Sequence, residues 1–242
     1  MPAEKLLLFD IDGTLIDTEG AGLYSLAEGF FNAFPEFQGK PFPALDLGGA
    51  TDGSVVAFLF ESFGIEDHEE HRTRFFAAYS VALEEKLGRF EREGKGRLLE
   101  GVPSLLEELR GGDHPYHIAL LTGNTCEGAG IKLRHYGIDH HFSFGAYGDD
   151  HPDRNALGPV ALKRAEEVHG LGLSPENVVI IGDTPKDIAC ARAFGARVIA
   201  VATGGSSEQD LRDCAPDFLL SSLSDTAAVI AALAQVFTQG ET

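Results

Sequence analysis

Short apolar runs alternate with helix-like segments along most of the sequence. Each run is too short for a typical helix and is dominated by aliphatic residues, which is typical of a strand buried on both faces of a sheet. The segments between the runs carry apolar residues at helical spacing. This alternation predicts an α/β fold in which a parallel β-sheet is flanked by helices. The predicted strands are residues 6–9, 117–121, 178–181, 198–202 and 218–220.

Polar residues of chemical interest follow the first three of these strands. Asp10 and Asp12 follow the first strand, residues 122–124 (Thr-Gly-Asn) follow the second, and residues 182–184 (Gly-Asp-Thr) follow the third. The carboxyl ends of parallel strands lie at one edge of the sheet, where open α/β folds bind their ligands. We therefore expect these side chains to converge on one site.

The segment between the first and second strands has a different character. It contains no convincing strand, shows amphipathic helical spacing in residues 23–31 and 55–63, and continues with a charged stretch at residues 66–92. This pattern predicts an all-helical insertion with a phenylalanine-rich interior, lying over the sheet edge as a lid. We expect a catalytic core of residues 1–16 and 97–242 and a helical cap domain of residues 17–96.

The charge balance limits the partners of this chain. Its 38 acidic and 19 basic residues give a net charge of −19, which argues against binding to nucleic acid or to an anionic membrane through a basic surface.

The first apolar run is too short for a signal sequence or a membrane span. The three cysteines are widely spaced without a CxxC pattern, which fits a reducing compartment. We expect a cytoplasmic protein, a monomer by default, with a homodimer as the alternative.

The aspartate pair at the end of the first strand has several interpretations. A calcium loop of the EF-hand type continues with further oxygen ligands and a late Glu, whereas residues 13–16 here are Gly-Thr-Leu-Ile. An ordinary solvated turn does not explain why Asp10 and Asp12 end an apolar run. Two carboxylates at a strand end suit nucleophilic catalysis beside a positioned proton carrier.

The motifs together resemble a known family. Residues 10–15 (Asp-x-Asp-Gly-Thr-Leu) resemble the first motif of the haloacid dehalogenase superfamily of aspartate-nucleophile phosphohydrolases. Residues 122–124 resemble its second motif and residues 182–187 its fourth, in matching order and spacing. The resemblance covers nearly the whole chain and includes a helical cap in the position used by the phosphoglycolate phosphatase and β-phosphoglucomutase-like branch. It implies a Rossmann-like core.

The resemblance also implies an activity, that of a phosphatase of small phosphorylated metabolites. Asp10 would attack the phosphoryl group and form an aspartyl-phosphate intermediate, which water then hydrolyses. Asp12 would protonate the leaving oxygen and later deprotonate that water. Thr122 and the amides near Gly123 and Asn124 would bind the phosphoryl oxygens.

The family resemblance further implies Mg²⁺ as the cofactor. Magnesium prefers oxygen ligands in octahedral geometry. The Asp10 carboxylate, the Asp12 backbone carbonyl and Asp183 would hold the ion, with Asp187 reinforcing the metal side of the site. For Asp187, a helix-capping role is the alternative, because acids in a first helical turn also suit the helix dipole.

The third motif departs from the family pattern. Family members place a lysine ahead of the helix that precedes the fourth motif, but residues 158–159 at the expected position are Gly-Pro. Arg154 is the nearest cation, and its guanidinium could pair with Asp10 or with both oxygens of a phosphate. Its alternative is an ion pair with acidic neighbours, and Lys186 or Lys163 are the other candidates for the motif.

Two other functions remain open from the sequence. A phosphomutase of the β-phosphoglucomutase type needs an anion clamp in its cap, and residues 20–22 and 51–53 offer no basic side chain there. A catalytically silent binding protein would account for the missing lysine, although Asp10, Asp12 and Asp183 are all present. The glycine-rich residues 203–207 follow the fourth strand and could approach a phosphate group, but an ordinary turn explains their glycines equally well.

Overall fold

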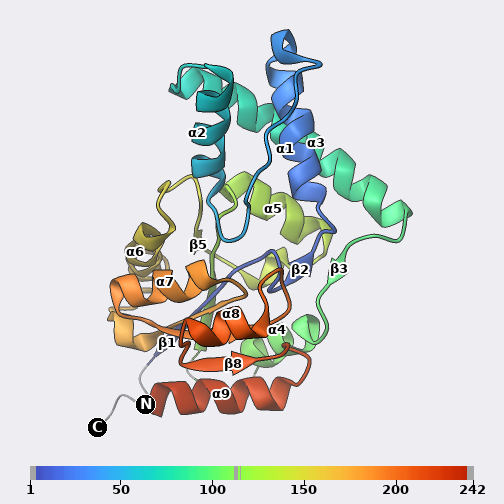
Figure 1. Cartoon of the computed structure of the whole chain (residues 1–242). Helices are drawn as coiled ribbons and strands as arrows, with labels where there is room; N and C mark the ends of the chain where they lie inside the picture. Colours follow the sequence, from blue (N-terminus) through green and yellow to red (C-terminus); the bar gives the residue numbers. More distant parts are fainter. Residues whose placement is uncertain (1–3, 112–113, 115, 239–242) are drawn as a thin grey trace.

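A six-stranded sheet in the order β5-β4-β1-β6-β7-β8 forms the centre of the core (Figure 1). The computed structural model describes residues 4–111, 114 and 116–238. All neighbouring strands in this sheet are parallel, and the predicted α/β fold is confirmed. The strands are β1 (Lys5–Phe9), β4 (Tyr116–Leu121), β5 (Gly145–Ala146), β6 (Val178–Gly182), β7 (Arg197–Val201) and β8 (Phe218–Leu220).

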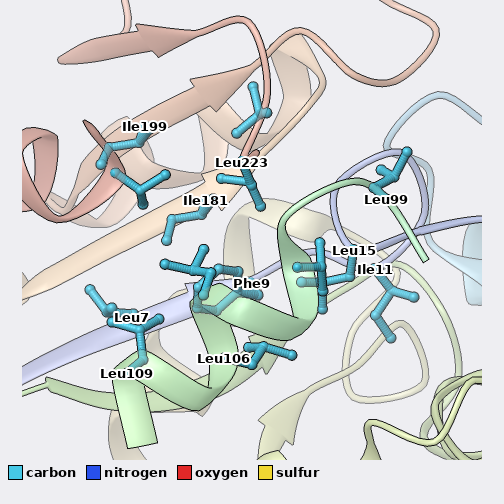
Figure 2. Close-up of a cluster of buried hydrophobic side chains, with 14 of the residues drawn as sticks. Leu7, Phe9, Ile11, Leu15, Leu99, Leu106, Leu109, Ile181, Ile199 and Leu223 are labelled. Carbon is cyan, nitrogen blue, oxygen red and sulfur yellow. The ribbon is translucent and has the colours of Figure 1, made fainter. Parts of the chain in front are cut away.

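Helices cover both faces of the sheet. Strand β1 sends Leu7 and Phe9 into one hydrophobic cluster and Leu6 and Leu8 into the other, as the two-residue period of a strand dictates. Figure 2 shows the first cluster, where Leu106 and Leu109 of α4 lie beside β1. Helices α4 (Val102–Gly111), α5 (Cys126–His135) and α9 (Thr226–Thr238) contribute to it, and α6 (Leu157–His169), α7 (Pro185–Phe194) and α8 (Glu208–Asp213) contribute to the second.

Three further helices lie above the carboxyl edge of the sheet (Figure 1). They are α1 (Ala21–Ala33), α2 (Asp52–Phe63) and α3 (Glu69–Arg92), with a 3-10 turn at η1 (Pro35–Phe37). They enclose a third hydrophobic cluster that includes Phe30, Phe34, Phe60 and Phe75. Helices α1 and α3 approach closely at Gly29, where a methyl group would lie 2.7 Å from the Tyr79 Cα atom. These phenylalanines form the interior of the helical unit as predicted, whereas Phe58, within the same apolar stretch of the sequence, is 46% exposed.

A small two-stranded antiparallel sheet connects the helical unit to the core. Strand β2 (Ile16–Asp17) pairs with β3 (Arg97–Leu98), so the chain leaves the core and returns to it side by side. An ion pair of 2.9 Å joins Arg97 to Asp17 across this two-stranded sheet. The domain boundaries expected from the sequence fall in this two-stranded sheet, and we propose residues 17–96 as the cap domain.

The remaining short elements are 3-10 turns that lie in loops of the core. They are η2 (Asp139–His141), η3 (Arg154–Ala156) and η4 (Pro175–Asn177). Across the part of the chain that the structure describes, none of the helices combines the length and the apolar character that crossing a membrane would require.

Candidate active site

A cavity of about 740 Å³ lies between the carboxyl edge of the sheet and the cap helices. On the core side, residues that follow β1, β4, β6 and β7 line it. On the cap side it is lined by residues of α1 and α2, by Tyr79 of α3, and by the segment before α2, which descends from the cap to the sheet edge (Figure 1). The predicted site residues that line this cavity are Asp10, Asp12, Thr122, Gly123, Asn124, Arg154 and Asp183.

Asp10 sits at the floor of the cavity with both carboxylate oxygens fixed. The residue is 5% exposed. The Ile11 backbone amide donates to Oδ1 at 2.8 Å, and the Arg154 Nη2 atom lies 3.1 Å from Oδ2. Burial raises the pKa of Asp10 to about 6, while the Arg154 charge acts in the opposite direction. The carboxylate is therefore held in one orientation beside a single counter-charge.

Arg154 is the cation that reaches Asp10. It lies in η3, is 5% exposed, and its Nη2 atom contacts Asp187 Oδ1 at 2.5 Å as well as Asp10. Its Nε atom is buried and has no hydrogen-bond partner within the described part of the chain. Lys163 is exposed and pairs with Glu167, and Lys186 is exposed in the first turn of α7. The geometry thus places Arg154, and neither lysine, in contact with Asp10.

Three buried carboxylates gather beside this guanidinium. Oxygen atoms of Asp10, Asp183 and Asp187 all lie within 4.8 Å of one another. Burial, together with the charges of Asp10 and Asp187, raises the pKa of Asp183 to about 8. A site with this excess of negative charge and only oxygen donors fits a hard divalent cation. Gly13 and Gly204 allow the backbone to approach, because a Cβ atom at either position would overlap the Asp183 carboxylate.

Asp187 is engaged within the protein through both oxygens. Its Oδ2 atom accepts hydrogen bonds from the Thr184 amide at 3.0 Å and the Thr184 hydroxyl at 2.7 Å, which forms a capping box at the start of α7. Its Oδ1 atom accepts from Arg154. These contacts make Asp187 a residue that caps α7 and orients Arg154.

The Thr122 hydroxyl is oriented by Asn124. The Asn124 Nδ2 atom donates to Thr122 Oγ1 at 2.8 Å, and the Asn124 backbone amide lies 3.3 Å from the same oxygen. A hydroxyl that accepts in this way still has its own proton to donate. Because Thr122 lines the cavity, that proton is available to an oxygen atom of a bound ligand.

Asp12 is bound by a lysine that the sequence analysis missed. Lys132 of α5 is 3% exposed, and its Nζ atom lies 2.8 and 2.6 Å from the two carboxylate oxygens of Asp12. The available signal was helical spacing, since Lys132 shares the buried side of α5 with Gly128 and follows the Thr125 cap by seven positions. Lys132 is thus a cation on the buried face of the helix that follows the second motif.

The cap contacts the second motif through the backbone and the side chain of Asp52. The Asp52 amide donates to the Gly123 carbonyl at 2.7 Å, and Asp52 Oδ2 accepts from the Thr125 amide at 2.9 Å. Burial raises the pKa of Asp52 to about 6, and the Lys132 charge opposes this effect. A Cβ atom at Gly123 would overlap the Ala50 carbonyl oxygen, so only glycine allows this approach. No pattern in the sequence predicts this contact.

The glycine-rich segment 203–207 also contributes to the site. Thr203 Oγ1 donates to the Gly13 carbonyl at 2.6 Å, and residues 203–206 line the cavity. From the sequence, an approach of this segment to phosphate and an ordinary turn are equally good explanations of its glycines. Its position beside Asp183 follows from the fold, because β7 lies next to β6 in the sheet.

Comparisons with known proteins agree with this geometry. A model of the haloacid dehalogenase-like hydrolases matches residues 7–192. A phosphoglycolate phosphatase of Mannheimia succiniciproducens is 24% identical over 233 residues, which are 93% of this chain and 98% of that protein. The pyrophosphatase PpaX of Halalkalibacterium halodurans is 25% identical over 226 residues, covering 93% and 95%.

A solved structure shares the fold. The crystal structure of a predicted phosphoglycolate phosphatase from Haemophilus somnus 129pt superposes with a TM-score of 0.66 at 21% identity, covering 95% of this chain and 99% of that one. The chain thus combines a parallel sheet with a cluster of carboxylates at the carboxyl ends of its strands. The chain belongs to the haloacid dehalogenase-like hydrolases, as its motifs predict, and is an enzyme of the phosphatase type.

Proposed function

We propose that this enzyme is a Mg²⁺-dependent phosphatase that hydrolyses a small phosphorylated metabolite through an aspartyl-phosphate intermediate. The observation that carries the proposal is the Asp10 carboxylate, held at the cavity floor between Arg154 and the Ile11 amide with Asp12 beside it. A fixed carboxylate next to a second, more exposed carboxyl group supplies a nucleophile and a proton carrier.

The first step transfers the phosphoryl group to Asp10. An Asp10 oxygen forms a bond to phosphorus while the bond from phosphorus to the ester oxygen breaks, and Asp12 gives its proton to that leaving oxygen. Arg154 holds the carboxylate in place. The Thr122 hydroxyl and the amides of the following residues donate to the phosphoryl oxygens.

The second step returns Asp10 to its resting form. Asp12, now a carboxylate, takes a proton from a water molecule, whose oxygen attacks phosphorus. The bond between phosphorus and the Asp10 oxygen breaks, inorganic phosphate is released, and Asp12 is protonated again. One water molecule is consumed and one ester bond is cleaved in each cycle.

The acidic cluster fits the proposed magnesium ion. The Asp10 carboxylate, the Asp12 backbone carbonyl and Asp183 would hold it, and Asp187 stands behind them against Arg154. When bound, the ion supplies positive charge that neutralises the transferring phosphoryl group.

The charges of the cavity wall favour hydrolysis over phosphomutase chemistry. Among the described residues that line the cavity, the basic side chains are Lys132 and Arg154, and both are ion-paired to aspartates. The cap side contributes the acids Asp46 and Asp52. A bisphosphate would need an unpaired cation for its second phosphate. The wall therefore supports a substrate with one phosphoryl group.

The test is phosphate release from a panel of small phosphate esters. We expect the wild-type protein to release phosphate in Mg²⁺ and to lose this activity in EDTA. Phosphoglycolate, the substrate in the name of a curated relative, belongs in the panel, as do glycerol phosphate and a hexose bisphosphate. Absence of turnover on every ester would contradict the proposal, and transfer of phosphate within the bisphosphate would indicate the mutase instead.

A second prediction concerns Arg154. Arg154→Lys keeps a positive charge but removes the planar guanidinium whose Nη2 atom contacts both Asp10 and Asp187. The shape and reach of a lysine differ, so Asp10 should be displaced, and a displacement of about 1 Å is expected to lower kcat by about 100-fold. Arg154→Ala leaves two buried carboxylates without a counter-charge and is expected to be destabilised by about 3–5 kcal/mol. Steady-state kinetics and thermal melting measure the two effects. Normal turnover by Arg154→Lys at unchanged stability would remove Arg154 from the mechanism.

The cellular setting is part of the same proposal. We infer a cytoplasmic enzyme, because all three cysteines are free thiols in the structure. The small phosphorylated substrate is the expected partner, and the monomer remains the default assembly.

A further inference from the structure

Lys132 is a buried ammonium group to which the mechanism above gives no task. Its three N–H donors have three acceptors, namely the two Asp12 oxygens at 2.8 and 2.6 Å and Asn124 Oδ1 at 2.6 Å. Gly22 of the cap helix α1 lies over it, since a methyl group there would be 3.7 Å from Nζ. The ammonium therefore has no donor left for a substrate and is enclosed between core and cap.

Asn124 completes a closed network around Asp12. Its Nδ2 atom donates to Asp12 Oδ2 at 2.8 Å, and its carbonyl oxygen accepts from Lys132. The Asp12 side chain is itself 43% exposed, on the side that faces the cavity. A carboxyl group this exposed would sample several rotamers if these two residues did not hold it.

The cost of burying Lys132 points to the same role. A buried ammonium is strongly unfavourable unless carboxylates compensate it. Asp12 is in direct contact, and the Lys132 charge is also felt by Asp52 of the cap. The fold thus places a costly cation where its contacts are those that orient the proton carrier.

We propose that Lys132 is a positioning residue, which acts through Asp12 by fixing its carboxyl group toward the leaving oxygen of the substrate. The proposal rests on the function proposed above, because it takes Asp12 as the proton carrier. Displacing a catalytic group by about 1 Å costs on the order of 100-fold in rate. The expected loss appears in kcat, since Lys132 makes no contact of its own with the ligand.

The test is a double-mutant cycle with Lys132→Met and Asp12→Asn. Methionine keeps a long unbranched side chain and removes the charge. On the ester that the wild type hydrolyses best, we expect Lys132→Met to lower kcat by about 100-fold with KM changed by less than about 3-fold. In the Asp12→Asn background the same substitution should change kcat by less than about 3-fold, because residues that act as a unit are not additive.

Two more variants make the result specific. Lys132→Arg keeps the positive charge, and a guanidinium can donate to both oxygens of a carboxylate. We therefore expect this variant to have a higher kcat than Lys132→Met. Lys86→Met is the matched control, because Lys86 is also nearly buried and pairs with Glu28 at 2.5 Å, but within the cap. Its kcat should equal that of the wild type. If Lys132→Met does not fold, Lys132→Gln, which keeps a donor for Asp12, replaces it in the cycle.

Several outcomes would overturn the proposal. A raised KM at unchanged kcat would assign Lys132 to substrate binding, and losses that add in the double variant would show that it acts independently of Asp12. Wild-type kinetics in Lys132→Met would overturn this proposal alone. No turnover by the wild type would overturn the proposed function and this proposal with it.

Discussion

Asp10→Asn is expected to lower phosphate release by about 10⁴-fold or more while leaving the protein folded. The amide is close to the carboxylate in size and can still accept a hydrogen bond from the Ile11 amide, but it cannot attack phosphorus to form an aspartyl phosphate. The fold should tolerate the change, because burial already disfavours the charged form of Asp10 and raises its pKa to about 6.

Two measurements check this expectation. Phosphate release in Mg²⁺ gives the rate, and mass spectrometry after acid quenching shows whether a phosphoryl group is attached to the peptide that carries Asp10. We expect the adduct in the wild type and none in the variant. Asp67→Asn is the control, since Asp67 is a cap residue that pairs with Arg72 and should leave turnover unchanged. A phosphorylated peptide elsewhere in the chain would place the nucleophile at another residue.

Asp183→Asn is expected to remove the response of the protein to Mg²⁺. Loss of a metal carboxylate should lower kcat by at least about 100-fold, since even outer-shell changes at metal sites reach that scale. For the wild type at pH 8, Mg²⁺ at about 100 times its Kd should add about 2.7 kcal/mol of stability, or a rise in Tm of about 5 °C or more. For Asp183→Asn this rise should be absent.

The stability of the metal-free protein should depend on pH in a direction set by the acidic cluster. In the folded protein the pKa of Asp183 is raised to about 8 and that of Asp10 to about 6, above their common reference value of 3.8. The folded state therefore binds more protons than the unfolded state in this range, and stability falls as the pH rises from about 4 to about 8. Asp183→Asn should flatten this dependence. Thermal melts at several pH values, with and without Mg²⁺, measure both effects, and an unchanged Mg²⁺ response in Asp183→Asn would exclude it as a ligand.

The central sheet could be predicted because its information is local. Each long strand is a continuous apolar run, and the first and third end directly in Asp10 and Asp183, so sequence order and sheet geometry suffice to bring these acids together. Strands β2, β3 and β5 have two residues each, which is too few for any periodic pattern. They form because a partner segment is held beside each of them by the rest of the fold: β4 beside β5, and the two connections to the cap beside each other.

The parts of the site that escaped prediction depend on contacts between distant segments. Asp52 meets residues 123–125 only when the cap lies on the core, and nothing near Asp52 in the sequence marks it. Lys132 faces Asp12 across 120 positions of sequence. The sequence favours Arg154 over two lysines because it is the cation nearest the expected position of the third motif, but its contacts with Asp10 and Asp187 follow from the placement of η3. Charged residues gain their roles here from tertiary packing.

The contact between Asp52 and the Gly123 carbonyl links two binding events that are usually considered separately. The same short segment that would receive the phosphoryl oxygens is the surface on which the cap rests, so any rearrangement of one changes the free energy of the other. By thermodynamic reciprocity, a ligand that binds residues 122–125 more tightly while the cap rests on them would favour the docked cap, and docking of the cap would raise the affinity for that ligand by the same factor. Inorganic phosphate, the product, would then itself act as an effector of cap position, and its departure would be coupled to opening.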